Sequence, residues 1–481
     1  MSARRTQIFE VSTLYGAATL AAAVDAGQFG PASRARRLLL VCNNADIPET
    51  ATRLQEMTGW ERVAARFDRV LSWNETIHPH HPSQWAPQEG DEVLWQRLLR
   101  EAWGIGAGPF DLVVESVHAR PAATLAAIFA DAELHVYADG LMVYGPTRER
   151  LPWPTACRVR RVLHPDLVPG LRPLLLAEYQ TPAEVVPSEA FRAVLAEITA
   201  EHGRSPVPGP DNGVPGPGTN APGPGTNAPG PGRGEPPARG GDTAVLLGQY
   251  LAALRLISAA EEEELHERML RGAAAAGCRT ILFKPHPTAP ARYSRALEKA
   301  AADEGVRLHV LESPMLAETL FARVTPRLVV GCFSTALLTA SALYGLPVAR
   351  VGTELLLERI TPYQNSNRVP LTLVDALLPD LLRARGGEVV TRRPDAAAEL
   401  TPLLRAVGYC MQPRLLPGLR AEAESWLGGH PPAEVARYFS RGRLTSLALP
   451  GGFAARLTRR LPGGRTALRL ARNLRRRATR G

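Results

Sequence analysis

A low-complexity stretch rich in proline and glycine divides this chain into two parts. Residues 215–221 read PGPGTNA, residues 222–228 repeat those seven letters, and PGPG follows at 229–232. Proline fixes the φ angle and lacks an amide donor, and glycine loses much conformational entropy on ordering. Such a stretch can neither join a sheet nor continue a helix, so we expect residues 205–241 to be a disordered linker between two folded units.

The rest of the composition is that of a folded protein. Of the 481 residues, 45% are hydrophobic and 21% are charged, which excludes disorder of the whole chain. The formal net charge of +9 comes from residues 451–481, which hold ten arginines and no acid, while 46 basic and 47 acidic residues remain elsewhere. The positive net charge therefore comes from the C-terminal tail and gives no reason to expect a nucleic-acid groove in the folded part.

Cysteine usage and hydropathy exclude further classes of protein. The five cysteines are scattered and form no C-x-x-C pair, which argues against a disulfide framework and a structural zinc site. The N-terminus lacks the apolar segment of a secretory signal, and no run approaches 18 uninterrupted apolar residues. We therefore expect a cytoplasmic protein.

Short apolar runs alternate with helical patterns in both parts of the chain. Strands interleaved with helices pair in parallel and form doubly wound sheets. The sequence therefore predicts an α/β protein with two Rossmann-like domains, residues 1–190 and 242–430, followed by a basic amphipathic tail at 431–481. The expected strands are 7–11, 38–42, 112–115, 134–137, 244–247, 280–284, 308–311 and 328–330, with helices at 14–26, 121–130 and 261–277.

Polar side chains follow several of these expected strands. Ligands of doubly wound folds bind beyond the carboxyl ends of the strands, so these positions are candidate site residues. In the first domain they are Asn43, Glu115, Ser116, Asp139 and Gly140. In the second domain they are Gly248, Gln249, His286, Pro287, Ser334 and Thr335.

Three of these strand ends carry a resemblance to a known family. LHVYADG ends at Asp139-Gly140, FKPHP contains His286, and VVGCFSTAL contains Ser334. In this order they resemble the acidic-acidic-Gly, His-Pro and Ser-Ser/Thr motifs of bacterial GT-B-fold sialyltransferases, above all the alpha-2,8-polysialyltransferase-like family. The resemblance spans most of residues 5–430. It departs from the family at Ala138, where the first acid of the acidic doublet is missing.

The resemblance implies an inverting, metal-independent glycosyltransferase without a cofactor. It would transfer sialic acid, or a related nonulosonic acid, from a CMP-activated donor to a glycan acceptor. The product would be either a single linkage or a polysialic acid-like polymer for a capsule or another surface polysaccharide. The N-terminal domain would bind the acceptor and the C-terminal domain the CMP donor. The implied roles are Asp139 as base and His286 as acid or phosphate partner, Lys284, Pro287, Ser334, Thr335 and Glu318 on the donor side, and Asn43, Glu115, Ser116 and Gly140 on the acceptor side.

The residue types agree with these roles, although structural alternatives exist. A carboxylate can take the proton of an attacking hydroxyl, and a histidine can protonate or stabilise a leaving phosphate. Ser334 begins a helical run, where free backbone N–H groups favour phosphate. Equally, Asp139-Gly140 can be a tight turn, His286 can end a strand, and Ser334 can be a plain N-cap.

Two other functions fit part of the sequence. A CDP-glycerol-type glycerophosphotransferase of teichoic-acid-like polymers also has a GT-B fold, a His-Pro element and a Ser-Ser element, and also releases CMP. A non-catalytic scaffold that binds a nucleotide or a polysaccharide would explain the missing acid at Ala138. The retention of Lys284, His286, Ser334 and Thr335 argues against the scaffold.

The arginine-rich tail suggests a membrane surface as a partner. Leu468, Ala471 and Leu474 follow helical spacing, and arginines occupy much of the remaining surface. A basic amphipathic helix of this kind binds anionic lipid, so we expect the protein to be peripheral at the inner face of the cell membrane. A disordered tail that binds polyanions is the alternative. No nucleic-acid partner is expected, because no aromatic residues interleave with the arginines.

Overall fold

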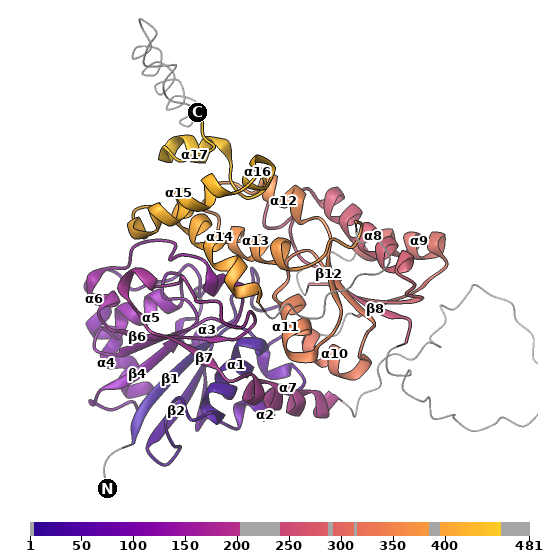
Figure 1. Ribbon diagram of the computed structural model, residues 1–481. Coiled ribbons are helices and arrows are strands. Elements are labelled where there is room, and N and C mark those ends of the chain that lie inside the picture. The colour runs from indigo at the N-terminus through magenta and orange to yellow at the C-terminus, as the bar shows by residue number, and fades with distance from the viewer. Residues whose placement is uncertain (1–3, 203–240, 287–291, 312–314, 384–394, 454–481) are drawn as a thin grey trace, which may run out of the picture.

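The computed structural model describes residues 4–202, 241–286, 292–311, 315–383 and 395–453. Residues 205–240 of the predicted linker, Pro287 and the arginine-rich residues 454–481 lie outside the described residues. Within the described part, two parallel sheets face each other, each with helices on both sides, and the chain has the two-domain α/β architecture of GT-B type (Figure 1).

The N-terminal sheet has seven parallel strands in the order β3-β2-β1-β4-β5-β6-β7. Most residues of its central strands are buried, because helices cover both faces of a parallel sheet. The strands are β1 (Arg5–Val11), β2 (Ala35–Val41), β3 (Arg69–Ser72), β4 (Phe110–Val114), β5 (Glu133–Tyr137), β6 (Val159–Pro165) and β7 (Ala183–Val186).

The helices of this half lie between the parallel strands along the chain. Thr13 caps the first of them, because its hydroxyl accepts a hydrogen bond from the Gly16 amide at 2.9 Å. The helices are α1 (Leu14–Asp25), η1 (Leu54–Glu56), α2 (Trp60–Ala64), α3 (Trp73–Ile77), α4 (Glu92–Trp103), α5 (Ala122–Ile128), η2 (Leu141–Tyr144), α6 (Trp153–Ala156), η3 (Ala177–Tyr179) and α7 (Ser188–His202).

The C-terminal sheet has five parallel strands in the order β10-β9-β8-β11-β12. The strands are β8 (Thr243–Leu247), β9 (Thr280–Lys284), β10 (Arg307–Val310), β11 (Leu328–Gly331) and β12 (Val348–Arg350). The helices are α8 (Ala259–Ala275), α9 (Arg292–Glu304), α10 (Ala317–Val324), α11 (Thr335–Tyr344), α12 (Thr353–Arg359), α13 (Arg368–Leu377), α14 (Ala396–Met411), η5 (Pro417–Leu419), α15 (Arg420–Gly429), α16 (Pro432–Tyr438) and α17 (Arg441–Leu447).

All eight strands expected from the sequence are present, and four further strands were not expected. β3, β7 and β12 are only three or four residues long and lie at sheet edges. β6 is longer, but Arg160 and Arg161 interrupt its apolar run. Short edge strands, and a strand interrupted by charged residues, bury little continuous apolar surface, so their hydrophobic pattern is weak.

The structure moves the start of the basic tail beyond the predicted residue 431. Residues 432–447 form α16 and α17, and Tyr438 and Leu444 are buried in an apolar cluster that also contains side chains of α14 and α15. Arg437 Nε on α16 donates to the buried Asp375 carboxylate of α13 at 2.5 Å. Because these side chains are buried, residues 431–453 belong to the folded C-terminal half.

The two halves share apolar core. One cluster of buried side chains extends from Ile8 of the N-terminal sheet to Val245 of the C-terminal sheet. The C-terminal helices contribute to it: a Cβ atom on Gly408 of α14 would lie 2.7 Å from Leu174 of the first half. In the described part of the chain no helix is long and apolar enough to cross a membrane.

Candidate active site

The carboxyl ends of the two sheets come together at Gly140 and Thr335. Gly140 follows β5 of the N-terminal sheet, and Thr335 begins α11 after β11 of the C-terminal sheet. A Cβ atom placed on Gly140 would lie 3.0 Å from Thr335 Oγ1. Tyr15 Oη of α1 lies 3.2 Å from Thr339 Oγ1 of α11. The Asp-Gly strand end of one half therefore faces the Ser-Thr strand end of the other.

Asp139 is held at this junction by the loop that leads into α1. Thr13 Oγ1 donates a hydrogen bond to Asp139 Oδ2 at 3.3 Å, and the side chain is partly exposed. Burial by the surrounding protein, followed by the negative charge of Glu115, raises the pKa of Asp139 to about 7. A carboxyl group with this pKa can accept a proton near neutral pH.

Two further carboxyl groups lie behind Asp139. Glu115 directly follows β4, and Ser12 Oγ donates to its Oε2 at 2.6 Å. The Glu115 amide donates to Glu10 Oε2 at 3.0 Å, and Glu10 is only 1% exposed although it lies within β1. Burial raises the pKa of both glutamic acids, and the charge of Glu115 raises that of Glu10 further. Such a pair holds a proton more readily than isolated carboxylates do.

On the C-terminal side, Lys284 and Glu318 form a pair of interacting charges. Lys284 is the last residue of β9, and Glu318 lies in the first turn of α10 with 3% exposure. Burial raises the pKa of Glu318 to about 7, and the Lys284 ammonium lowers it in part. Burial likewise lowers the pKa of Lys284, against which the charge of Glu318 acts. The ammonium group brings positive charge to this side of the junction.

His286 lies two residues after β9 and packs against Tyr250. The two ring centroids are 4.0 Å apart. Burial, and then the positive charge of Lys284, lowers the pKa of His286 to about 4. The imidazole is therefore neutral at physiological pH, with one N–H to donate. An anionic ligand beside it would raise this pKa and favour the protonated ring.

Ser334 and Thr335 form the start of α11. Ser334 is the N-cap, and its Oγ accepts from the Ala336 amide at 3.3 Å. The preceding loop is fixed by the Phe333 amide, which donates to Gln249 Oε1 after β8 at 2.9 Å. A helix N-terminus of this kind carries partial positive charge and favours anions.

Of the remaining predicted residues, Asn43 lines a separate pocket and Ser116 lies in a turn. The Asn43 amide donates to Asn74 Oδ1 at 2.8 Å, and both residues line a separate pocket of about 860 Å³ beyond β2 and β3. The carbonyl of Ser116 accepts from the Ala119 amide at 3.3 Å within a turn. Pro287 lies outside the described residues.

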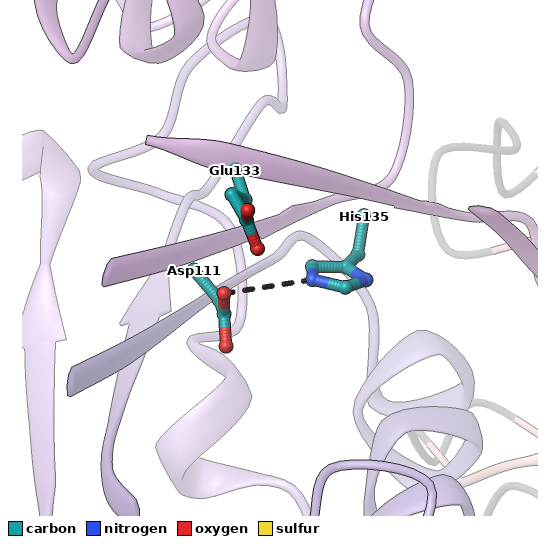
Figure 2. A group of neighbouring side chains, drawn as sticks. All are labelled: Asp111, Glu133 and His135. Carbon is teal, nitrogen blue, oxygen red and sulfur yellow. Dashed lines mark ion pairs between the residues drawn. The ribbon is translucent and has the colours of Figure 1, made fainter. Parts of the chain in front are cut away.

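A group of possible metal ligands occurs toward the amino ends of two central strands of the N-terminal sheet, away from the junction. Asp111, Glu133 and His135 lie together on β4 and β5 (Figure 2). Arg5 Nη2 lies 2.5 Å from Asp111 Oδ1 and 2.8 Å from Glu133 Oε2, and Arg161 Nε donates to His135 Nδ1 at 3.0 Å. Because arginines occupy the ligand atoms, we interpret this group as an ion-pair network of the sheet.

Sequence reasoning did not single out several residues of the junction. Thr13 and Tyr250 follow strands or precede helices as ordinary loop residues do, so nothing in the sequence distinguishes them. Glu10 carried a signal, since a carboxyl group inside the apolar strand QIFEV is costly unless it has a partner. That partner, the Glu115 amide, is 105 residues away in sequence.

Comparison with known proteins identifies the family. A family model described as alpha-2,8-polysialyltransferase matches residues 7–353. This match covers more than half of the chain. The chain belongs to the alpha-2,8-polysialyltransferase family. No curated protein matches its sequence.

Solved structures show distant similarity. A 2,6-sialyltransferase from a Photobacterium species, solved with CMP and lactose, is 11% identical with a TM-score of 0.39, over 77% of this chain and 75% of that one. A sialyltransferase from Photobacterium damsela is 10% identical with a TM-score of 0.38, over 78% of this chain and 79% of that one. An O-GlcNAc transferase from Thermobaculum terrenum is 16% identical with a TM-score of 0.34, over 90% of this chain and 68% of that one. These values are too low to support an argument about the reaction.

Membership in the polysialyltransferase family makes this protein a glycosyltransferase that transfers sialyl residues. The matched range runs from β1 to the start of α12 and contains the Asp-Gly, His-Pro and Ser-Thr strand ends. The expectations of fold class, family and enzyme class are thus confirmed, while the roles of individual residues stay predictions.

Proposed function

We propose that this polysialyltransferase-family protein transfers sialic acid, or a related nonulosonic acid, from a CMP-activated donor to a glycan hydroxyl. The single observation that carries the proposal is the approach of Gly140 to Thr335, because it brings a carboxyl group with a raised pKa to a helix N-terminus that suits phosphate. The C-terminal half would bind the donor and the N-terminal half the acceptor.

Asp139 would act as the base. Its carboxylate takes the proton of the acceptor hydroxyl while the hydroxyl oxygen forms the new bond to the anomeric carbon of the sugar. The bond from that carbon to the CMP phosphate oxygen breaks on the opposite face, so the anomeric configuration inverts. The proton ends on Asp139 and the electron pair of the broken bond on CMP.

The donor-side residues would stabilise the leaving phosphate. The α11 N-terminus with the Ser334 and Thr335 hydroxyls favours the negative charge, and Lys284 supplies a full positive charge nearby. His286 is neutral without a ligand. Once the phosphate binds, its charge raises the proton affinity of the imidazole, so the ring can donate to or protonate the leaving oxygen. Glu318 would hold the nucleotide ribose.

Isothermal titration of the full-length protein with CMP, UMP and ADP tests the donor site. We expect CMP to bind selectively and His286→Ala to weaken it about tenfold, the loss of one charge-assisted hydrogen bond of about 1.4 kcal/mol. His309→Ala on the edge strand β10 is the matched control and should leave affinity unchanged. Absence of nucleotide binding in the wild type would contradict the proposal.

A transfer assay separates the proposal from its nearest rival. Protein that binds CMP is incubated with CMP-sialic acid or with CDP-glycerol, and the product is analysed for sialic acid and for phosphate. The proposal predicts sialic acid in the product and no phosphate. Incorporation of phosphoglycerol would instead assign a glycerophosphotransferase activity.

A further inference from the structure

Three carboxyl groups stand at the carboxyl ends of three adjacent strands. Glu10 lies near the end of β1, Glu115 directly follows β4, and Asp139 comes two residues after β5; these three strands are neighbours in the sheet. Val114 pairs with Val136, so Glu115 lies beside Tyr137 at the end of the next strand. The loop after β1 joins two of them, because Ser12 Oγ donates to Glu115 Oε2 and the adjacent Thr13 Oγ1 donates to Asp139 Oδ2. The Glu115 amide also donates to Glu10 Oε2, so the three carboxyl groups form one cluster at the junction of the two halves.

Hydrogen bonds fix Glu115 within this cluster. Ser12 Oγ, from the loop after β1, donates to Glu115 Oε2 at 2.6 Å, and the Glu115 amide donates to Glu10 Oε2 at 3.0 Å. Burial raises the pKa of Glu115, and the short hydroxyl bond from Ser12 acts against burial by favouring the ionised form. Glu10 is almost fully buried, and burial favours its protonated form.

Tyr137 places a buried hydroxyl in the same cluster. Its side chain is fully buried, and its Oη has no hydrogen-bond partner among the described residues. A Cβ atom on Gly16 would lie 3.1 Å from Tyr137 Oη and 3.3 Å from Asp139 Oδ2, so both groups border the start of α1. A buried polar atom without a partner is costly, and this one can serve as a donor to a neighbouring carboxylate.

We propose that Glu115 is a positioning residue for the base: its carboxylate, held by Ser12, keeps a negative charge behind Asp139 and so strengthens Asp139 as a proton acceptor. This inference deepens the proposed function and rests on it. Packing alone does not explain the cluster, because a half-buried carboxylate beside two other carboxyl groups costs stability. Among the charges that act on Asp139, that of Glu115 has the largest effect on its pKa.

Other titratable groups also act on Asp139 or belong to the same cluster. Glu318 on α10 adds a second negative charge that raises the pKa of Asp139, and Lys284 on β9 interacts with Glu318. The remaining titratable groups of the cluster are Tyr15 on α1, Cys42 after β2, Tyr137 on β5 and Glu10 on β1. A test must therefore remove the charge of Glu115 alone.

The test is a direct titration of Asp139 that needs neither donor nor acceptor. Full-length protein labelled with carboxyl-13C aspartate is titrated by NMR, and the Asp139 signal is identified by its absence in Asp139→Asn. In Glu115→Gln we expect the midpoint of Asp139 to fall by about one pH unit, because a nearby like charge has been removed. Glu115→Asp keeps the charge and should keep a midpoint close to that of the wild type.

Controls separate charge from damage to the fold. Glu49→Gln makes the same chemical change at an exposed position on the same side of the sheet and should leave the midpoint unchanged. Glu115→Ser removes the charge with a smaller side chain and serves where Glu115→Gln does not fold. An unchanged Asp139 midpoint in a folded variant without the Glu115 charge would overturn the inference.

The proposed function and the role of Glu115 can be contradicted independently of each other. If the wild type transfers no sialic acid, the proposed function fails, while the titration still decides whether Glu115 controls the proton affinity of Asp139. If transfer occurs and Glu115→Gln leaves both the midpoint and the low-pH limb of kcat/KM in place, only the role of Glu115 is overturned.

Discussion

At the residue scale, Asp139 combines burial with access to the junction between the halves. Burial and the charge of Glu115 raise its pKa, while part of the side chain remains exposed to a ligand. An ordinary surface aspartate is a weak base at neutral pH, because its conjugate acid is strong. A carboxyl group with a pKa near the working pH combines a useful ionised fraction with a strong tendency to take the proton.

The raised pKa of Asp139 predicts how the rate of transfer depends on pH. The base must be ionised, so kcat/KM should fall as the pH decreases through the raised pKa of Asp139, about 7, and should be constant above it. The measurement is the initial rate at subsaturating substrate from about pH 5 to about pH 9, with donor hydrolysis followed in parallel. A limb centred near the ordinary aspartate value of 3.8 would show that the pKa is not raised.

At the element scale, α11 connects helix capping to ligand binding. Ser334 caps this helix, so Ser334→Ala should lower the free energy of unfolding by about 1 kcal/mol. If the hydroxyl also contacts phosphate, CMP affinity should fall about tenfold, the value of one hydrogen bond to a charged group. Urea denaturation and calorimetric titration measure the two effects.

Ser258→Ala is the matched control for the capping effect. Ser258 caps α8 of the same half, and its side chain accepts from the Glu261 amide. This variant should lose comparable stability and keep its full affinity for CMP. Equal affinity for CMP in Ser334→Ala and Ser258→Ala would show that Ser334 only caps the helix.

Elements that bury long apolar runs could be predicted from the sequence, and those stabilised by distant contacts could not. The predicted strand at 280–284 coincides with β9, because TILFK is a compact apolar run between a helix and a proline. The edge strand β3 has two exposed residues out of four and no such pattern. Asp139 and Ser334 were found at strand ends, whereas Thr13 enters the site through a contact 126 residues away in sequence.

At the scale of the whole molecule, the site depends on how the two halves meet. Gly140 approaches Thr335 without a side chain of its own. In Gly140→Ala the new Cβ would lie 3.0 Å from Thr335 Oγ1 and force the hydroxyl to move. An off-rotamer shift costs about 0.5–1.5 kcal/mol, so CMP affinity should fall by up to about tenfold.

Gly108→Ala is the matched control, because its Cβ would meet no atom within 4 Å. Calorimetric titration of both variants with CMP measures the effect, and thermal unfolding checks the fold. The same affinity in Gly140→Ala as in Gly108→Ala would contradict the contact between the halves.

The arginine-rich end of the chain predicts a further property of the whole molecule. Residues 456–481 hold ten arginines and no acid, and each arginine near an anionic lipid surface contributes about 1 kcal/mol. Deleting these residues should release the protein from phosphatidylserine vesicles in a sedimentation assay and leave transfer to a soluble acceptor intact. Unchanged sedimentation with vesicles would show that residues 456–481 are not the membrane-binding segment.

The most direct test of the central claim is transfer of labelled sialic acid from CMP-sialic acid to a sialylated oligosaccharide, measured beside CMP binding. The wild type should transfer the label. Asp139→Asn should lose turnover by a factor of about 10² to 10⁴ while it binds CMP with unchanged affinity, because the base acts on the acceptor. Normal turnover in Asp139→Asn, or a wild type that binds CMP and transfers nothing, would contradict the assignment of this site.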